Sequence, residues 1–390
     1  MNRLKRFLQR QWAGLIGTFY LPVWIIEGAE AKSAAPLSLA YAGVEKHKNY
    51  LLHSVFGVHF NEKSLGKIWI GDISRKVRQS GGVSPSVIVR EMGTRQNRFF
   101  KPVGNFRIPV WVETEFKLVE PLEVIEKKPD FRKIRSRIRS QQTTHSFSSD
   151  KALFDEFYKS MYVSYTAQSH KDSAFIYDYD FLKKEFEEGE ILFVEKDDVR
   201  IGGILIHYSK NEAKLRSFGV LNGSEEYLQI GTLGILIYLA ILRIKEKGYS
   251  AAQLGYSRGY LLDGALRFKT RMGISVKATH HRESGFLSYE FLRYDEPVKN
   301  FLAAHPFIDA EKGSRAVVFI ADAGVLKAEN AAEFVKNRFC RGLEGMTLYS
   351  FSAEDAPGKI ALPGGVFAEA DLVPAFSLFA SAVCGKEKNA

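Results

Sequence analysis

Residues 229–273 read QIGTLGILIYLAILRIKEKGYSAAQLGYSRGYLLDGALRFKTRMG. We expect a strand to run directly into the glycine-spaced turn Gly231-Thr232-Leu233-Gly234, which opens an apolar helix ending at Gly248. A second strand and a second helix, which ends at Gly273, follow. Such a turn leaves backbone N–H groups free at the positive end of a helix dipole. The stretch therefore predicts a site for a pyrophosphate or another anion.

The length and composition bound the class of protein. A chain of 390 residues is expected to hold two or three domains. With 45% apolar and 13% aromatic residues it can build proper cores. The formal net charge of +10 favours an anionic partner such as a nucleotide, nucleic acid or an acidic membrane face, with a solvated basic surface as the alternative. Cys340 and Cys384 lack metal-ligand spacing, so we expect no metal site and a reducing, cytoplasmic compartment.

The N-terminal segment, residues 1–34, is basic up to Arg10 and mostly apolar from Trp12 to Ile26. This is the outline of a signal peptide, but glycines and Pro22 interrupt the apolar run, which is also too short to span a bilayer. We expect a helix that lies at the inner membrane surface or packs on the core, with a cleaved signal peptide as the alternative.

The rest of the chain divides into three further regions. A small α/β domain is expected over residues 35–130, with strands near residues 37–43, 68–70 and 87–89 and an edge strand that contains Pro109. A larger domain over residues 131–300 begins with a basic helix whose Ile134 and Ile138 face inward. A C-terminal extension, residues 301–390, holds a buried strand at residues 317–320 and a helix at residues 331–339.

The larger domain has a definite order of elements. Two helices, around residues 153–161 and 181–189, precede three strands, Ile191–Glu195, Arg200–His207 and Lys214–Val220, which form an antiparallel meander. The glycine turn, a buried helix over residues 232–247, a strand and a last helix complete it. The fold class is therefore α/β (α+β), with a mixed, mostly antiparallel central sheet flanked by helices.

This order resembles the GNAT-type N-acyltransferases, and more closely their FemABX-like branch, over roughly residues 131–293. Three pieces carry the resemblance: the basic helix Arg132–Arg139, the strand pair with Gly202-Gly203, and Tyr256-Ser257-Arg258-Gly259 followed by Gly264, Phe268, Lys269 and Gly273. The resemblance implies a GNAT fold and acyl transfer to an amine. It leaves open whether the N-terminal domain is a degenerate second GNAT unit.

The glycine turn departs from the acyl-CoA loop of the family. Gly231 and Gly234 are three residues apart, and Gln229 stands two before Gly231. The resemblance still implies that these three residues contact an acyl-CoA, acetyl-CoA above all, with glycine packing against a strand as the alternative. It also places the backbone N–H groups of Phe218 to Val220 at the oxyanion of the reaction.

Three side chains are candidates for catalysis. Lys269 stands where ordinary GNAT enzymes place a tyrosine acid, so it could guide a proton or neutralise an anion, with a solvated helix lysine as the alternative. Tyr165 and His170 fall in the predicted loop after the helix around residues 153–161, where the family often binds its acceptor. His170 could serve as a base because its ordinary pKa is about 6.5, with an exposed loop histidine as the alternative.

Five residues are candidates for substrate binding. Ser257 and Arg258 follow a strand at the edge where open α/β sheets bind ligands, and Arg258 suits a phosphate or a carboxylate, with a surface salt bridge as the alternative. Arg135 and Arg139 in the basic helix could hold a nucleotide-sugar phosphate, a lipid pyrophosphate or tRNA. Phe268 belongs to the Phe-Lys pair that carries the resemblance.

These residues together predict an N-acyltransferase that moves an acyl group from acyl-CoA to an amine. Family analogy suggests an amino sugar or amino acid used in envelope or exopolysaccharide assembly. The alternatives are an aminoacyl-tRNA-dependent transferase, in which tRNA would be the nucleic-acid partner, and a non-catalytic binding module. Residues 1–26 could also make a peripheral membrane contact.

Overall fold

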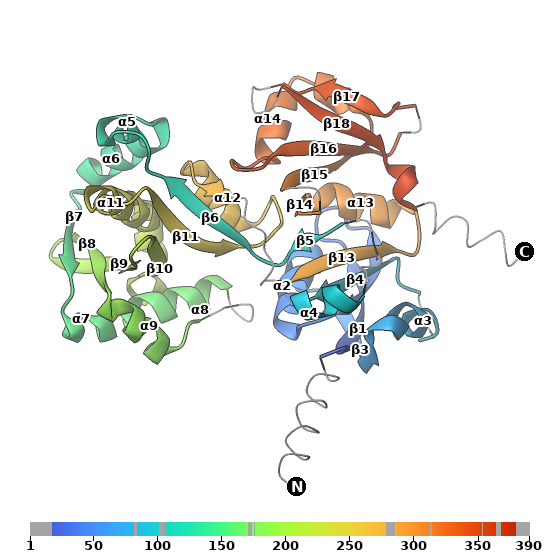
Figure 1. Cartoon of the computed structure of the whole chain (residues 1–390), viewed down its shortest axis with the longest axis horizontal. Coiled ribbons are helices and arrows are strands. Elements are labelled where there is room, and N and C mark those ends of the chain that lie inside the picture. Colours follow the sequence, from blue (N-terminus) through green and yellow to red (C-terminus); the bar gives the residue numbers. More distant parts are fainter. Residues whose placement is uncertain are drawn as a thin grey trace, which may run out of the picture. The chain divides into compact units, whose positions relative to one another are not determined.

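The computed structural model describes residues 18–379 apart from 82–83, 101–103, 105, 171–173, 175, 278–284, 312–313, 353 and 364–367. The chain forms two compact units (Figure 1). Unit 1 consists of residues 1–112, 258–266 and 278–390, and unit 2 consists of residues 113–257 and 267–277. Both units interleave in sequence, so each completes its fold with segments far apart along the chain.

The N-terminal part of unit 1 is a six-stranded sheet. Its strand order is β3 (Phe60–Trp69), β1 (Tyr20–Ala29), β2 (Pro36–Ala42), β4 (Val87–Met92), β13 (Phe286–Phe291) and β5 (Ile108–Pro109). Strands β2 and β4 run parallel, and the other pairs are antiparallel. Helices α2 (Glu45–Phe56), α3 (Ile73–Arg78) and α4 (Thr94–Phe99) accompany the sheet. The predicted edge position of Pro109 is confirmed, because β5 lies at the edge of the sheet.

The predicted N-terminal helix is wrong from Tyr20 onward. This segment is strand β1, which lies inside the sheet between β3 and β2. Its Val23, Ile25 and Ile26 are buried, and β-branched side chains of this kind favour a strand. The run looks uniformly apolar because both faces of the strand are covered. Residues 1–17 lie outside the described residues.

The C-terminal part of unit 1 is a five-stranded sheet. Its order is β14 (Phe307–Asp309), β15 (Arg315–Ile320), β16 (Gly345–Ser350), β18 (Glu369–Pro374) and β17 (Gly358–Ala361). Helices α13 (Glu296–Ala304) and α14 (Ala331–Asn337) and two short 3-10 turns, η5 (Ala323–Lys327) and η6 (Ala375–Phe379), join these strands. One apolar core, which includes Phe106, Phe307, Phe319 and Phe379, connects this sheet to the N-terminal sheet of the same unit. The predicted strand and helix of this region are confirmed.

Unit 2 is built on a seven-stranded sheet. Its order is β12 (Ser275–Val276), β6 (Val112–Lys117), β11 (Ala251–Ser257), β10 (Ala213–Val220), β9 (Val199–Tyr208), β8 (Gly189–Lys196) and β7 (Thr144–Ser148). The predicted antiparallel meander β8–β9–β10 is confirmed. Asp197 and Asp198 make its first turn with φ values of 50° and 61°, the left-handed backbone of a tight hairpin. The mostly antiparallel mixed sheet flanked by helices is the predicted fold class.

Helices cover the sheet of unit 2. They are α5 (Leu122–Glu126), α6 (Pro129–Gln141), α7 (Lys151–Glu156), the π-helical η2 (Phe157–Val163), α8 (Ser164–His170), α9 (Tyr179–Glu187), the turn η4 (Leu221–Gly223), α10 (Glu225–Ile230), α11 (Thr232–Glu246) and α12 (Gly264–Arg271). The inward stripe predicted for α6 is confirmed, because Ile134 and Ile138 pack on the core beneath α11. Helix α11 is buried along most of its length, as its continuous apolar sequence predicts.

Two local predictions in unit 2 need correction. The strand does not run directly into the glycine turn, because helix α10 separates β10 from Gly231. Glu225 and Glu226 lie in the first turn of α10, where carboxylates favour the positive end of the helix dipole. Tyr165 and His170 do not lie in a loop either. They belong to α8, because the π-helical turn η2 continues the second helix past Met161.

The boundaries expected at residues 34, 130 and 300 remain predictions. Strand β6 precedes residue 130 but joins the sheet of unit 2, whereas β13 precedes residue 300 but joins the sheet of unit 1. Among the described residues, no helix has the length and apolar character needed to cross a bilayer.

Candidate functional site

Strands β10 and β11 of unit 2 separate soon after they meet. They run parallel and pair only at Ala213 with Ala252 and at Lys214 with Gln253, near their amino-terminal ends. Beyond these two pairs β10 continues to Val220 and β11 continues to Ser257 without pairing to each other. The sheet therefore opens toward the carboxyl ends of two parallel strands, the place where α/β sheets bind ligands.

Strand β10 is irregular at two places along the segment that does not pair with β11. A β-bulge between Leu215 and Ser217 shifts its register against β9. Farther along, a Cβ atom on Gly219 would lie 2.2 Å from the carbonyl oxygen of Met161 in η2, so only glycine fits there. Bulges and close backbone approaches of this kind re-aim a strand locally.

A pocket lies where the two strands diverge. It is open to solvent, and its empty volume is about 460 Å³. Strands β6, β10 and β11 and the residues Tyr177 and Lys277 outside the strands form its walls, with the following lining: Glu113, Thr114, Tyr177, Lys214, Leu215, Arg216, Gln253, Gly255, Tyr256 and Lys277.

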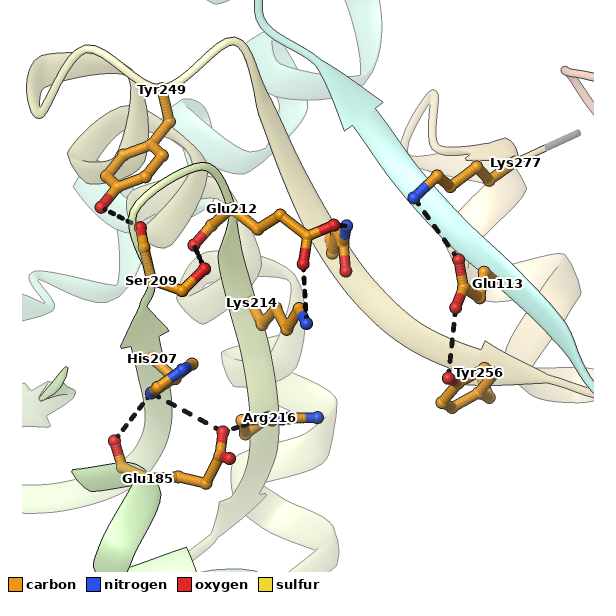
Figure 2. Close-up of polar contacts among 11 residues, drawn as sticks. Glu113, Glu185, His207, Ser209, Glu212, Lys214, Arg216, Tyr249, Tyr256 and Lys277 are labelled. Atoms are coloured by element: carbon orange, nitrogen blue, oxygen red, sulfur yellow. Dashed lines mark hydrogen bonds and ion pairs between the residues drawn. The ribbon is translucent and has the colours of Figure 1, made fainter. Parts of the chain in front are cut away.

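Glu113 supplies the carboxylate of this pocket (Figure 2). Its Oε1 accepts a hydrogen bond of 3.2 Å from the Tyr256 hydroxyl, and its Oε2 lies 3.5 Å from Nζ of Lys277. The Glu113 side chain is 32% exposed, so solvent and a small ligand can reach it. Burial and the negative charge of Glu113 raise the pKa of Tyr256, so this phenol keeps its proton at neutral pH.

Three cations line the pocket, and each has a carboxylate partner. Lys214 lies 2.8 Å from Glu212, and Nε of Arg216 lies 2.5 Å from Glu185. Lys277 pairs with Glu113 (Figure 2). Hydrogen bonding by Lys214 holds the pKa of Glu212 below its ordinary value. These pairs orient the polar groups of the pocket and leave its net charge near neutrality.

Lys269 stands behind the pocket as a buried lysine. Only 5% of its surface is exposed, and its Nζ donates 3.0 Å hydrogen bonds to Oγ1 of Thr114 and to the carbonyl oxygen of Tyr256. The alternative of a solvated helix lysine is therefore wrong. Because Lys269 links β6 to β11, it holds the strands that carry Glu113 and Tyr256.

Gly231 joins two helices and meets an arginine. Its φ of 84° places it in the left-handed region between α10 and α11, which an L-residue adopts at a cost. A Cβ atom there would lie 2.2 Å from Nη1 of Arg137 in α6. Arg137 thus reaches the N-terminal end of α11, and an anion there would meet both the helix dipole and a guanidinium group. Gly234 lies in the first turn of α11 with room for a Cβ atom.

The other predicted residues of unit 2 are dispersed. Gln229 is exposed at the end of α10, Phe218 and Phe268 pack on the core, and Val220 is buried at the end of β10. The ring of Tyr165 lies 6.2 Å from that of Phe218, and burial raises its pKa. The side chain of His170 lies outside what the structure describes. Arg135 is half-buried on α6 and Arg139 is exposed on the same helix.

Ser257 and Arg258 are neighbours in sequence with different surroundings. Ser257 ends β11 and is buried, and its hydroxyl has no hydrogen-bond partner in the described part of the chain. Arg258 belongs to unit 1, where its guanidinium lies over the rings of Trp111 and Tyr50 at 3.7 and 4.5 Å. The alternative of a surface salt bridge is wrong, because Arg258 is 8% exposed.

Sequence reasoning missed most of the pocket. Glu113 and Lys277 carry no motif, and Lys214 and Arg216 appeared only within a predicted strand. The quoted stretch 229–273 contains Gln253, Gly255 and Tyr256, but none of them was predicted as a site residue. The available signal was the alternation of β6, which places Glu113 and Glu115 on one face and Thr114 and Phe116 on the other. In the described residues no group of three or more His, Cys, Asp or Glu side chains is arranged to hold a metal ion.

No protein-family profile and no curated protein matches the chain. Solved structures do resemble it. FemX shows 11% identity and a TM-score of 0.36 over 75% of this chain and 93% of FemX. A GCN5-related N-acetyltransferase from Sphaerobacter thermophilus shows 14% identity and a TM-score of 0.32, covering 66% of this chain and 74% of the enzyme. L-PGS from Bacillus licheniformis shows 12% identity and a TM-score of 0.33, covering 73% of this chain and 87% of that one.

These structural neighbours are GNAT-fold proteins, as the sequence resemblance implied. Similarity at this level concerns the arrangement of the chain and says nothing about its activity. The pocket and the opening between β10 and β11 stand on the geometry of this chain alone.

Proposed function

We propose that this chain is an acyltransferase that moves an acyl group from a thioester of coenzyme A to the amine of an acceptor. The observation that carries the proposal is the loss of pairing between parallel strands β10 and β11 beyond Lys214 and Gln253. An extended chain such as the pantetheine arm can bond to the exposed peptide groups of a separated strand. Its thioester would then reach the pocket at Glu113.

The pocket supplies the groups that transfer requires. The acceptor nitrogen attacks the carbonyl carbon, and Glu113 takes the proton that the amine loses. The C–S bond breaks as the C–N bond forms, and the Tyr256 hydroxyl gives the leaving sulfur a proton. Protonated Glu113 then returns the proton of the amine to Tyr256 along the hydrogen bond that joins them. Glu113 and Tyr256 are already joined by a hydrogen bond, and Lys277 steadies the carboxylate. This route needs no covalent enzyme intermediate.

The donor end of the site is supported by Gly231 and Arg137. Coenzyme A carries phosphates that suit the N-terminus of α11, and the Arg137 side chain lies against Gly231. The acceptor is an amine, and an amino sugar or amino acid for envelope assembly remains part of the proposal. Its identity rests on family analogy.

The basic helix α6 favours a second candidate, an aminoacyl-tRNA donor. Arg132, Arg137 and Arg139 are exposed, and no ion pair within the described residues neutralises them. A tRNA would engage several such cations at once, so its affinity would fall steeply with salt. Coenzyme A would engage few of them and respond much less.

Donor binding tests the proposal. Acetyl-CoA, longer acyl-CoAs and free coenzyme A are titrated while the melting temperature is followed, since a ligand that binds only the folded state raises it. We expect a saturable rise that weakens about tenfold in Arg137→Gln, consistent with loss of one charged contact. Arg132→Gln, on the same helix but not against Gly231, is the matched control.

The outcomes separate the candidates. No response to any coenzyme A compound at millimolar concentration would reject the acyl-CoA donor. Salt-sensitive binding of aminoacyl-tRNA in its place would support the second candidate. Binding of coenzyme A without transfer to any amine would indicate a non-catalytic module.

A further inference from the structure

A polar and aromatic cluster lies in unit 1, within a sheet that does not carry the proposed acyl-transfer pocket. Strands β2 and β4 are its parallel pair, so their carboxyl ends share one edge. Tyr41 stands next to the end of β2, and Glu91 stands next to the end of β4. Helix α2 begins just after β2 and brings His47 and Tyr50 to the same edge. This is again where α/β sheets bind ligands.

The carboxylates of this cluster are already occupied. Glu91 lies 2.7 Å from Nδ1 of His47 and accepts hydrogen bonds from the Tyr41 hydroxyl and the Val44 N–H. Burial alone would raise the pKa of Glu91, but these bonds outweigh it and lower that pKa. Asp263 accepts hydrogen bonds from the Tyr50 hydroxyl at 2.7 Å and from the Leu266 N–H at 2.8 Å.

Arg258 is the unsatisfied member of the cluster. Its guanidinium lies over Tyr50 and Trp111, so the ring faces hold its plane. Only 8% of the surface of Arg258 is exposed. Yet among the described residues it makes no ion pair, and no acceptor bonds its N–H groups. Its nitrogens are not among the fully buried atoms that lack a partner, so they keep some contact with solvent, while burial of the side chain lowers its pKa.

We propose that the cluster around Arg258 is a second ligand site, which binds the carboxylate group of a small molecule or peptide. A planar guanidinium and a planar carboxylate match in a two-bond fork. The negative charges of Glu91 and Asp263 oppose any anion in the cluster, and they oppose a phosphate dianion more strongly than a carboxylate with a single charge. The rings of Tyr50 and Trp111 offer an apolar surface to the remainder of the ligand. His47 is 21% exposed, so the cluster reaches the surface beside it.

The site has a built-in optical probe. The chain has four tryptophans, of which Trp24, Trp69 and Trp111 belong to unit 1 and Trp12 lies outside the described residues. Trp111 contacts both the Arg258 guanidinium and the His47 ring. A ligand that moves Arg258 should therefore change tryptophan emission, and Trp111→Phe should remove that change without removing binding.

The experiment compares two matched probes. N-acetyl-L-alanine carries the carboxylate, and N-acetyl-L-alaninamide replaces it with a neutral amide of the same shape. We expect a saturable fluorescence change with the first in the millimolar range and none with the second. Arg258→Met should weaken binding at least tenfold, whereas Arg293→Met, an exposed arginine of the same unit, should leave it unchanged.

A second readout separates a ligand site from a structural arginine. Replacing this largely buried charge, which makes no ion pair among the described residues, by an apolar side chain should raise the melting temperature of the ligand-free protein, as expected for a residue kept for binding. A lower melting temperature in Arg258→Met with unchanged binding would overturn the proposal. If that variant fails to fold, Arg258→Lys keeps the charge but lacks the planar fork, and equal binding by it would also overturn the proposal.

Inorganic phosphate is the remaining arm. Saturable binding of phosphate with no response to N-acetyl-L-alanine would overturn the assignment to a carboxylate. If neither N-acetyl-L-alanine nor inorganic phosphate produces a response, the proposal of a ligand site at Arg258 is wrong. None of these outcomes depends on coenzyme A, so they are independent of the acyltransferase proposal.

Discussion

At the scale of single residues, the proposed chemistry rests on Glu113. It is the carboxylate that lines the pocket, and both of its oxygens contact partners within that pocket. Glu113→Gln keeps the shape of the side chain but cannot accept a proton at neutral pH. We expect a loss of kcat of about 10²-fold or more, with donor affinity unchanged.

The control for this prediction lies two residues away on the same strand. Glu115→Gln changes the same charge outside the pocket and should leave kcat within about twofold, as expected for a half-exposed surface group. Steady-state kinetics against pH is the measurement. If Glu113→Gln transfers acyl groups at the wild-type rate, another group must serve as the base.

Ser257 carries a prediction about the same opening. Its hydroxyl is buried without a partner in the described chain, so removing it should cost little stability. Ser257→Ala should stay as stable as the wild type but bind acyl-CoA more weakly, by about 1 kcal/mol if one hydrogen bond is lost. Ser288→Ala removes another buried, unpartnered hydroxyl, in unit 1, and should not change binding. Calorimetric titration of the three proteins decides between a ligand contact and an idle hydroxyl.

The buried carboxylate of Glu30 should make the stability of unit 1 fall at acidic pH. It is fully buried and lies 2.9 Å from Nε2 of His305. Burial would raise its pKa, but the bonds from His305, Ser33 and Lys32 lower the pKa to about 2. Because the folded pKa lies below the ordinary value of 4.5, the carboxylate stabilises the fold above pH 4.5. That contribution is lost as pH falls toward 2.

Glu30→Gln removes this contribution. We expect a loss of about 1–3 kcal/mol at pH 7 and a flatter dependence of stability on pH between about 4.5 and 2. Denaturant unfolding at a series of pH values measures both. If the free energy of unfolding changes with pH in the same way in the wild type and in Glu30→Gln, the predicted contribution of Glu30 is wrong.

At the scale of elements, two glycines in one motif have different physical roles. Gly231 adopts a φ of 84° between α10 and α11, whereas Gly234 lies inside α11, with the nearest heavy atom 3.8 Å from an added Cβ. Gly231→Ala should destabilise by about 1–2 kcal/mol because the left-handed backbone disfavours a side chain. Gly234→Ala should stabilise by about 0.5–1 kcal/mol because alanine favours a helix interior.

Chemical denaturation of both variants tests this contrast. If Gly231→Ala lowers the stability and Gly234→Ala raises it, then only Gly231 is required as glycine by the backbone conformation. A loss of stability in Gly234→Ala as well would mean that its backbone makes a close approach that the structure does not contain.

At the scale of the whole molecule, the two units differ in their optical signals. Trp24, Trp69 and Trp111 belong to unit 1, Trp12 lies outside the described residues, and the sequence of unit 2 contains no tryptophan. Tryptophan fluorescence therefore follows the unfolding of unit 1, while circular dichroism follows both units. Acyl-CoA at about 100 times its Kd should stabilise its own unit by about 2.7 kcal/mol, a shift of roughly 5–10 °C.

We expect that shift in circular dichroism but not in tryptophan emission, since the proposed donor site lies in unit 2. Thermal melts recorded by both signals provide the measurement. Equal shifts in the two signals would mean that the units unfold as one cooperative body, and a shift in fluorescence alone would place the donor in unit 1.

Local periodicity in the amino-acid sequence was enough to predict several elements of unit 2. The meander β8–β9–β10, the inward stripe of α6 and the buried helix α11 were all predictable, because their alternating or helical apolar patterns lie within single segments. It failed at β1, where a strand covered on both faces resembles a continuous apolar run, and at α8, where a π-helical turn breaks the spacing that marks a helix.

The two proposed sites, in contrast, form only when the whole chain has folded. Glu113 meets Tyr256 across 143 residues, and Lys269 bonds to Thr114 across 155, after strands from distant segments have joined one sheet. Arg258 stands beside Ser257 in sequence, yet its ring partners Tyr50 and Trp111 come from the N-terminal part of the chain. The local pattern of apolar residues shows which face of a helix or strand is buried. It does not show which strand edges meet, and the pocket and the Arg258 cluster both depend on that meeting.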